Sequence, residues 1–247
     1  MSEQFRSKTL GVMQPYIFPY VGYFSLAAAV DTFVFLDDVQ MIKRGWVNRN
    51  NILLNGEAHR FTIPLVGSSQ TKNINQVGVT DDYVPFLRLV ENGYAKAPFR
   101  KDALALISDV MSFDKTNLAT FAANSIKQVC AYIGLKAEFL LSSEVPQAPG
   151  LRAQDKIIEI NKALSASRYV NPIGGTDLYD GDIFAREGID LLFVKAKLPE
   201  YPQNGQAFVP GLSIIDLLMF LPPDEIRRNV SEYQLIESAQ FKADHSD

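Results

Sequence analysis

Residues 37–51 gather cationic and ring-bearing side chains in a chain whose net charge is −4. Lys43, Arg44 and Arg49 lie close together, and Trp46, the only tryptophan, lies among them. An arginine fork matches the geometry of a phosphate, and lysine supplies a compact charge. An indole ring stacks on a base or a sugar. This combination suits a nucleotide diphosphate or a nucleotide-sugar.

Amide side chains interleave with these cations. Asn48 and Asn50 can read sugar hydroxyls or base edges. The alternative is an exposed loop in which the cations pair with nearby aspartates and Trp46 covers the core.

Two carboxylates at the end of an apolar run could handle a proton. Asp37 and Asp38 follow residues 32–36, and either could act as a general base, a hydroxyl acceptor or a metal ligand. Neighbouring residues of a strand face opposite sides, so we prefer Asp38. Turn formation or helix capping is the alternative. Asp216 is the second candidate base, although it also fits an acidic variant of a capping box that begins at Ser213.

The loop after the first apolar run holds three tyrosines and two prolines. We expect Gln14, Tyr16, Tyr20 and Tyr23 to flank one ligand pocket near Asp38. Prolines stiffen the loop, and a stiff loop loses less entropy when a ligand binds. Core packing is the alternative for the aromatic rings.

A second loop leads into the last predicted helix. Ser213 can cap that helix, while Gln203 and Asn204 remain free to meet a ligand. A helix N-terminus favours an anion, so capping and binding are compatible.

The remaining reactive side chains give weaker evidence for a functional site. His59 lies in an alternating strand pattern and Cys130 in an apolar helix pattern, and neither has an activating neighbour in the sequence. No cysteine and histidine spacing indicates zinc, so the sequence predicts no metal site.

The elements that must position these groups alternate between strand and helix. Asn55-Gly56 between two apolar runs indicates a hairpin. Three helices in succession predict a helical insert at 81–134 within a single α/β domain over 1–247. Expected strands are 9–13, 32–36, 51–54, 58–64, 137–141, 168–170 and 190–195, and expected helices are 22–30, 83–96, 99–112, 116–133, 152–165, 180–187 and 213–220. This order predicts an α/β fold with a Rossmann-like, mostly parallel sheet.

Composition narrows the classes of function. A sequence pI near 5.3 argues against a nucleic-acid binder. No apolar run approaches the ~20 residues that span a bilayer. The polar N-terminus and the single cysteine indicate a cytoplasmic protein. The oligomeric state is left open, a homo-oligomer included.

Four stretches together resemble the WbqC-like protein family, and the resemblance covers roughly residues 8–220. They are Gln14-Pro15-x-x-x-Pro19-Tyr20-x-Gly22-Tyr23-Phe24, Asp31-x-Phe33-Val34-x-Leu36-Asp37-Asp38-Val39-Gln40, Lys43-x-x-Trp46-x-Asn48-Arg49-Asn50 and Phe208-x-Pro210-x-Leu212-Ser213-Ile214-x-Asp216-Leu217-Leu218. The resemblance adds Gln40 to the candidate binding residues. Some relatives have histidine where this chain has Met13.

The resemblance implies a cytoplasmic step in making a bacterial surface sugar, as in O-antigen. Our leading hypothesis is transfer of an acyl or aminoacyl group to the amino group of a nucleotide-linked deoxysugar. The donor would be an acyl thioester or an acid activated by ATP. One alternative is a nucleotidyltransferase-like enzyme that activates an acid or a sugar phosphate with ATP. Another is a nucleotide-sugar binding protein without catalysis.

Overall fold

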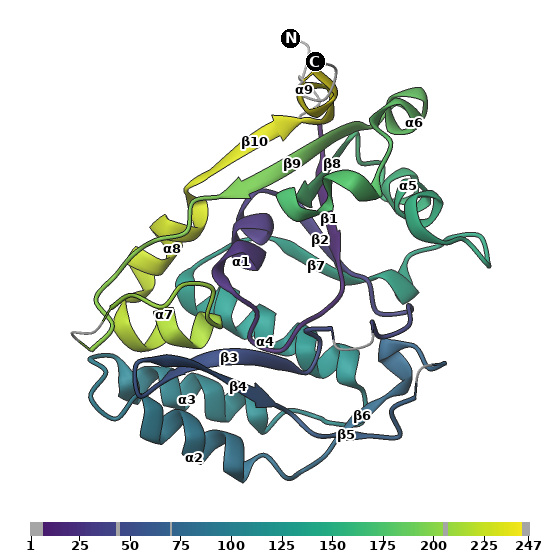
Figure 1. The fold of residues 1–247 in the computed structure, drawn as a ribbon. Helices are drawn as coiled ribbons and strands as arrows, with labels where there is room; N and C mark the ends of the chain where they lie inside the picture. Colours follow the sequence, from purple (N-terminus) through teal and green to yellow (C-terminus); the bar gives the residue numbers. More distant parts are fainter. Residues whose placement is uncertain (1–6, 43–44, 70, 205–206, 244–247) are drawn as a thin grey trace.

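A six-stranded sheet forms the centre of the computed structural model, which describes residues 7–42, 45–69, 71–204 and 207–243 (Figure 1). The strand order is β10-β9-β8-β1-β2-β7. All neighbours are parallel except β10 and β9. The strands are β1 (Thr9–Met13), β2 (Thr32–Phe35), β7 (Glu138–Leu141), β8 (Arg168–Pro172), β9 (Asp190–Ala196) and β10 (Tyr233–Glu237). Counted in chain order, this is the 3-2-1-4-5-6 arrangement of dinucleotide-binding folds, which confirms the predicted class.

Helices cover both faces of the sheet, as Figure 1 shows. Alternate residues of each strand feed two separate cores. Leu10, Val12 and Val34 pack with the α5 and α6 side, whereas Phe33 and Phe35 pack with the α1, α4 and α8 side. The helices are α1 (Val21–Ala28), α4 (Leu118–Ile133), α5 (Ala153–Ala163), α6 (Gly181–Arg186), α7 (Ile214–Phe220), α8 (Pro223–Ser231) and α9 (Ser238–Ala243). No helix in the described ranges is long and apolar enough to cross a membrane.

The chain leaves the sheet between β2 and β7 and builds a separate layer, drawn at the bottom of Figure 1. This layer contains the hairpin of β3 (Arg49–Leu54) and β4 (Glu57–Thr62), the short strands β5 (Leu65–Val66) and β6 (Gly78–Val79), and the helices α2 (Val84–Gly93) and α3 (Arg100–Met111). The predicted hairpin is confirmed, with positive φ at Asn55 and Gly56 as a tight turn requires. The segment 81–134 holds α2, α3 and α4, and α4 brings the chain back to the sheet.

The ends of α4 follow from its sequence. The side chain of Asn117 accepts hydrogen bonds from the backbone N–H groups of Ala119 and Thr120, which caps the first turn. Gly134 ends the helix in a left-handed conformation, with φ of 76°.

The opening loop is fixed at Phe18, which has a positive φ of 43°. Its carbonyl oxygen accepts hydrogen bonds from Asn50 Nδ2 at 2.9 Å and from Ser213 Oγ at 2.6 Å. Its N–H donates to Ser125 Oγ on α4 at 3.2 Å. One strained residue therefore joins the loop after β1 to the hairpin, to α4 and to the start of α7.

A second junction forms around Asp216, which is fully buried on α7. Its carboxylate accepts hydrogen bonds from the hydroxyls of Tyr94 at 2.8 Å and Tyr201 at 2.6 Å, and from Gln203 Nε2 at 2.6 Å. Tyr94 also accepts a hydrogen bond from the N–H of Leu53 in the hairpin. Burial raises the pKa of Asp216, and the three donors oppose that shift only in part.

We predict that Tyr94→Phe lowers the free energy of unfolding by about 1–3 kcal/mol, because Asp216 loses a donor and the Leu53 N–H loses its acceptor inside the core. Chemical denaturation measures the change. The matched control is Tyr132→Phe, since Tyr132 is a partly exposed tyrosine on α4, and it should change stability by less than about 0.5 kcal/mol. Equal effects from both substitutions would contradict the structural role of this junction.

Candidate functional site

Parallel sheets of this order bind ligands at the carboxyl ends of their strands, where the strand order reverses. Here the reversal lies between β1 and β8. A cavity of about 440 Å³ lies at this edge of the sheet, between the segment after β2, the start of α5 and the segment after β8. Its polar lining residues are Asp38, Gln40, Asn73, Arg152, Lys156 and Tyr179. We call this space the switch-point cavity.

Asp38 and Lys156 form an ion pair in this cavity, with 2.6 Å between Asp38 Oδ2 and Lys156 Nζ. The Asp38 side chain is 24% exposed and that of Lys156 is 10% exposed. Burial alone would raise the pKa of Asp38, but hydrogen bonds from Lys156 and Ser142 and the charge of Lys156 outweigh it and hold the pKa below its usual value. The pair places an ionised carboxylate beside an ammonium at the cavity wall.

Asp37, one residue earlier, has a different environment. It is buried, and its carboxylate accepts hydrogen bonds from Ser142 Oγ, from the N–H and hydroxyl of Ser143, and from Asn75 Nδ2. These contacts tie the end of β2 to the turn η2 (Ser142–Glu144) after β7. Asp37 is therefore occupied by structural partners, whereas Asp38 lines the cavity.

The start of α5 turns the first backbone N–H groups of a helix toward this region, and no side chain of the described residues caps them. Ala153 has a positive φ of 46°. Arg152 is exposed at the cavity edge. The first N–H groups of a helix together with two cations favour an anion.

A smaller cavity of about 180 Å³ lies where the opening loop meets the hairpin. Tyr16, Tyr20, Trp46 and Asn50 contribute to its lining. Trp46 is 43% exposed, and the guanidinium of Arg60 lies 5.6 Å from the centre of its ring. We call this space the aromatic cavity. Its walls suit a flat or sugar-like ring.

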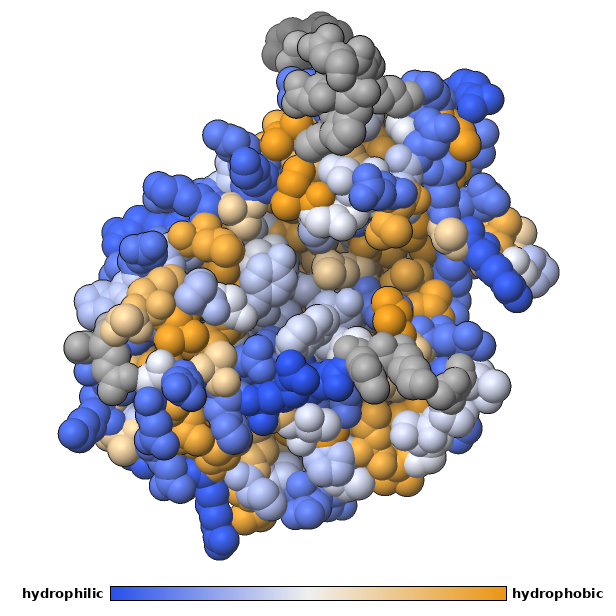
Figure 2. Space-filling view, viewed as in Figure 1, coloured by the Kyte–Doolittle hydropathy of each residue, from blue (hydrophilic) through white to orange (hydrophobic). Residues whose placement is uncertain are grey.

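Figure 2 shows the surface of the molecule from the same side as Figure 1. Hydrophilic side chains form a band over the β3–β4 hairpin, and the surface is hollowed between this hairpin and the large sheet.

Comparison with known proteins identifies the family of the chain. The model of the WbqC-like protein family matches residues 14–228. The chain belongs to the WbqC-like family. It is also 28% identical over 228 residues to "Uncharacterized protein Rv1507c" of Mycobacterium tuberculosis (strain ATCC 25618 / H37Rv), an alignment that covers 89% of this chain and 98% of that protein. No solved structure matches the chain significantly.

Several residues of the WbqC-like motifs form hydrogen bonds within the protein and do not line a cavity. Tyr23 is buried and donates its hydroxyl hydrogen to the carbonyl of Gln14. Asn48 bonds the carbonyl of Ile63. Arg49 Nε donates to the carbonyl of Gly45 at 2.6 Å, which shapes the loop.

Polar side chains in and near the C-terminal WbqC-like motif are also buried. Ser213 caps α7 and is buried. Gln203, expected to be free for a ligand, is 1% exposed and bonded to Asp216. Asp216 is 0% exposed and lines none of the cavities described here, so in this structure it forms a junction. Asn204 is exposed and has a positive φ of 51°.

Two further residues complete the predicted set. Gln14 follows β1, and its Oε1 is buried without a hydrogen-bond partner among the described residues. Lys43 lies outside the described residues. Lys156, Arg152 and Ser142 were not predicted, because they are far from Asp38 in sequence and no local pattern marks them.

Cys130 is a buried thiol on α4. Burial raises its pKa to about 12, so the reactive thiolate is scarce at neutral pH. His59 is exposed on β4.

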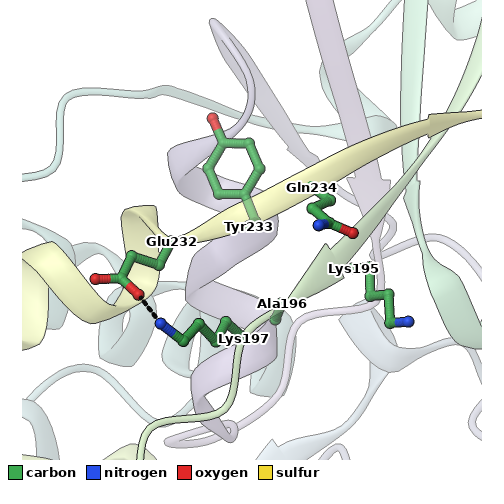
Figure 3. A pocket seen from close by; sticks show the side chains of 6 residues that line it. All are labelled: Lys195, Ala196, Lys197, Glu232, Tyr233 and Gln234. Atoms are coloured by element: carbon green, nitrogen blue, oxygen red, sulfur yellow. Dashed lines mark hydrogen bonds and ion pairs between the residues drawn. The ribbon is translucent and has the colours of Figure 1, made fainter.

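A third cavity, of about 470 Å³, lies at the pairing of β9 with β10. Figure 3 shows Lys197 and Glu232 paired at its margin, with 2.7 Å between their charged atoms. Its lining includes none of the predicted site residues, and Tyr233 reaches from it toward the end of α1.

We predict that Lys156→Met raises the pKa of Asp38, measured by NMR titration of the carboxyl carbon. The variant should also lose about 1–3 kcal/mol of unfolding free energy at neutral pH. Because the folded-state pKa of Asp38 lies below its unfolded value near 3.8, this stability exists above that value and is lost as the pH falls through the folded pKa. Wild type and variant should therefore converge in acid.

Lys162→Met is the control for this experiment, because Lys162 pairs with Glu187 on the surface. An exposed pair contributes about 0–1 kcal/mol. An unchanged Asp38 titration in Lys156→Met would contradict the electrostatic account of the cavity.

Proposed function

We propose that this protein is an enzyme that transfers an acyl or aminoacyl group to the amino group of a nucleotide-linked deoxysugar. The observation that carries the proposal is the switch-point cavity, in which an ionised carboxylate and two cations surround the uncapped start of α5. Membership of the WbqC-like family supports a setting in surface-sugar synthesis.

We assign the parts of such a substrate to the two cavities. Arg152, Lys156 and the first N–H groups of α5 would hold the diphosphate. Trp46, Tyr16 and Tyr20 would stack on a ring in the aromatic cavity.

Asp38 would accept a hydrogen bond from the sugar amine and orient its lone pair toward the acyl carbon. As the C–N bond forms, the nitrogen becomes strongly acidic and its proton passes to the carboxylate. The bond to the thiol or phosphate of the donor breaks, and that group leaves with the electron pair. The donor is an acyl thioester or an acid activated by ATP. No protein nucleophile is needed, which agrees with the inert setting of Cys130.

Nucleotidyl transfer has less support. One superfamily of nucleotidyltransferases carries the motif His-x-Gly-His in the loop after its first strand. The two histidines would correspond to positions 20 and 23, and both are tyrosines in this chain. Tyr23 is buried against Phe33, so it cannot contact a nucleotide.

We predict that Arg152→Ala weakens the binding of a nucleoside diphosphate, such as dTDP, by about ten- to a hundredfold, because one charge-assisted hydrogen bond contributes about 1.5–3 kcal/mol. Calorimetric titration measures the change. Arg228→Ala, which removes an exposed cation from α8, is the control and should bind dTDP like wild type. If Arg152→Ala also binds dTDP unchanged, the diphosphate does not lie at the start of α5.

We predict that Asp38→Asn abolishes amide formation on a nucleotide-linked amino sugar while retaining binding of that sugar within about tenfold. The amide can still donate and accept hydrogen bonds, but it cannot take a proton. Product formation is followed by mass spectrometry with thioester or ATP-dependent donors. Full turnover in Asp38→Asn would remove Asp38 from the chemistry. Sugar binding without turnover in wild type for every donor would favour the non-catalytic alternative.

A further inference from the structure

A separate cavity of about 280 Å³ lies between α4 and the edge strand β7. We call it the α4–β7 cavity. Thr120, Ala123, Asn124 and Lys127 form one wall. Their spacing of three and four residues puts all four on one face of α4. None of the residues proposed to bind the nucleotide-sugar lines this space.

The wall of the cavity opposite α4 is apolar. Phe139 and Leu141 are alternate residues of β7 and therefore point to the same side of the sheet. Phe113, from the segment after α3, adds a third apolar surface and is 39% exposed. Phe139 stacks against Phe35 with ring centres 5.6 Å apart, which fixes the wall in place.

One buried polar group on the lining lacks a hydrogen-bond partner among the described residues, and two exposed charged groups lack an ion-pair partner. Asn124 Nδ2 is buried and has no hydrogen-bond acceptor. Lys127 and Glu144 contribute opposite charges, and neither forms an ion pair within the described ranges. Lys127 instead lies 5.8 Å from the ring centre of Phe35. A buried donor without an acceptor costs free energy, which a ligand oxygen would recover.

We propose that the α4–β7 cavity binds a small apolar α-amino acid. The ligand carboxylate would meet Lys127 and Asn124 Nδ2, the ligand ammonium would meet Glu144, and the apolar side chain would pack on Phe139, Leu141 and Phe113. A simple fatty acid would leave Glu144 unused, and a simple amine would leave Lys127 and Asn124 unused. The zwitterion is the small ligand that uses all three polar groups and the apolar wall.

The turn η2 links this cavity to Asp38, which lines the switch-point cavity. Leu141 and Glu144 line the α4–β7 cavity. Ser142, between them, donates toward the carboxylates of Asp37 and Asp38.

L-leucine is the probe. The matched compounds are 4-methylpentanoate, which lacks only the ammonium, and isopentylamine, which lacks only the carboxylate. Binding is measured on the full chain by NMR, from the concentration dependence of the shift of the Asn124 side-chain amide. We expect leucine to bind at least tenfold more tightly than either matched compound. Lys127→Met and Glu144→Gln should each weaken leucine binding by about ten- to a hundredfold.

Lys136→Met and Glu91→Gln serve as controls, because both residues are exposed and lie off this cavity. Both variants should bind leucine like wild type. Absence of leucine binding, equal binding of leucine and 4-methylpentanoate, or unchanged binding in Lys127→Met and Glu144→Gln would each overturn the proposal.

The proposal does not depend on the nucleotide-sugar activity, because it concerns different residues. Titration of dTDP into Lys127→Met should match wild type. A protein that binds leucine but no nucleotide would refute only the function proposed for the switch-point cavity. A protein that binds dTDP but no leucine would refute only the site described here.

Discussion

The carbonyl oxygen of Phe18 receives two hydrogen bonds from residues far away in the chain, Asn50 and Ser213, and the arrangement of the layers depends on it. The positive φ of Phe18 is unfavourable for a residue with a bulky side chain, so it persists only because the surrounding contacts hold it. The same contacts set the position of Tyr16 and Tyr20 relative to Trp46. The shape of the aromatic cavity therefore depends on the conformation of Phe18. Three of the WbqC-like motifs contact one another at this residue.

Asp37 and Asp38 are adjacent in the chain but have different surroundings. Asp37 is enclosed by hydroxyl, amide and backbone donors, so it gains nothing from a ligand. Asp38 faces a cavity, and Lys156 is the cation paired with it among the described residues. A carboxylate that stays ionised and partly solvated can bind a substrate ammonium, whereas one with saturated hydrogen bonds cannot.

Local signals in the sequence explain what could be predicted. The Asn55-Gly56 turn, the spacing of apolar residues in α4 and the buried runs of β1, β2 and β9 are periodic or steric patterns within a few residues. Strand β10 and helix α8 were not predicted, since β10 is a largely exposed edge strand and α8 carries few apolar residues. The inward roles of Ser213 and Gln203, and the partnership of Lys156 with Asp38, depend on contacts between distant segments. No local pattern records such contacts, so polar motif residues with interior partners resembled ligand-binding residues.

The position of β1 in the middle of the sheet has a consequence for biosynthesis. One side of β1 pairs with β2, which follows it closely, but the other side pairs with β8, beginning at Arg168. While the ribosome is still making the insert, the nascent chain can assemble β1, β2 and the hairpin layer with one edge of β1 unpaired. An apolar strand with a bare edge is a template for association with other chains. The emergence of β8 closes that edge, so translation speed through residues 36–168 determines how long the chain is vulnerable to aggregation.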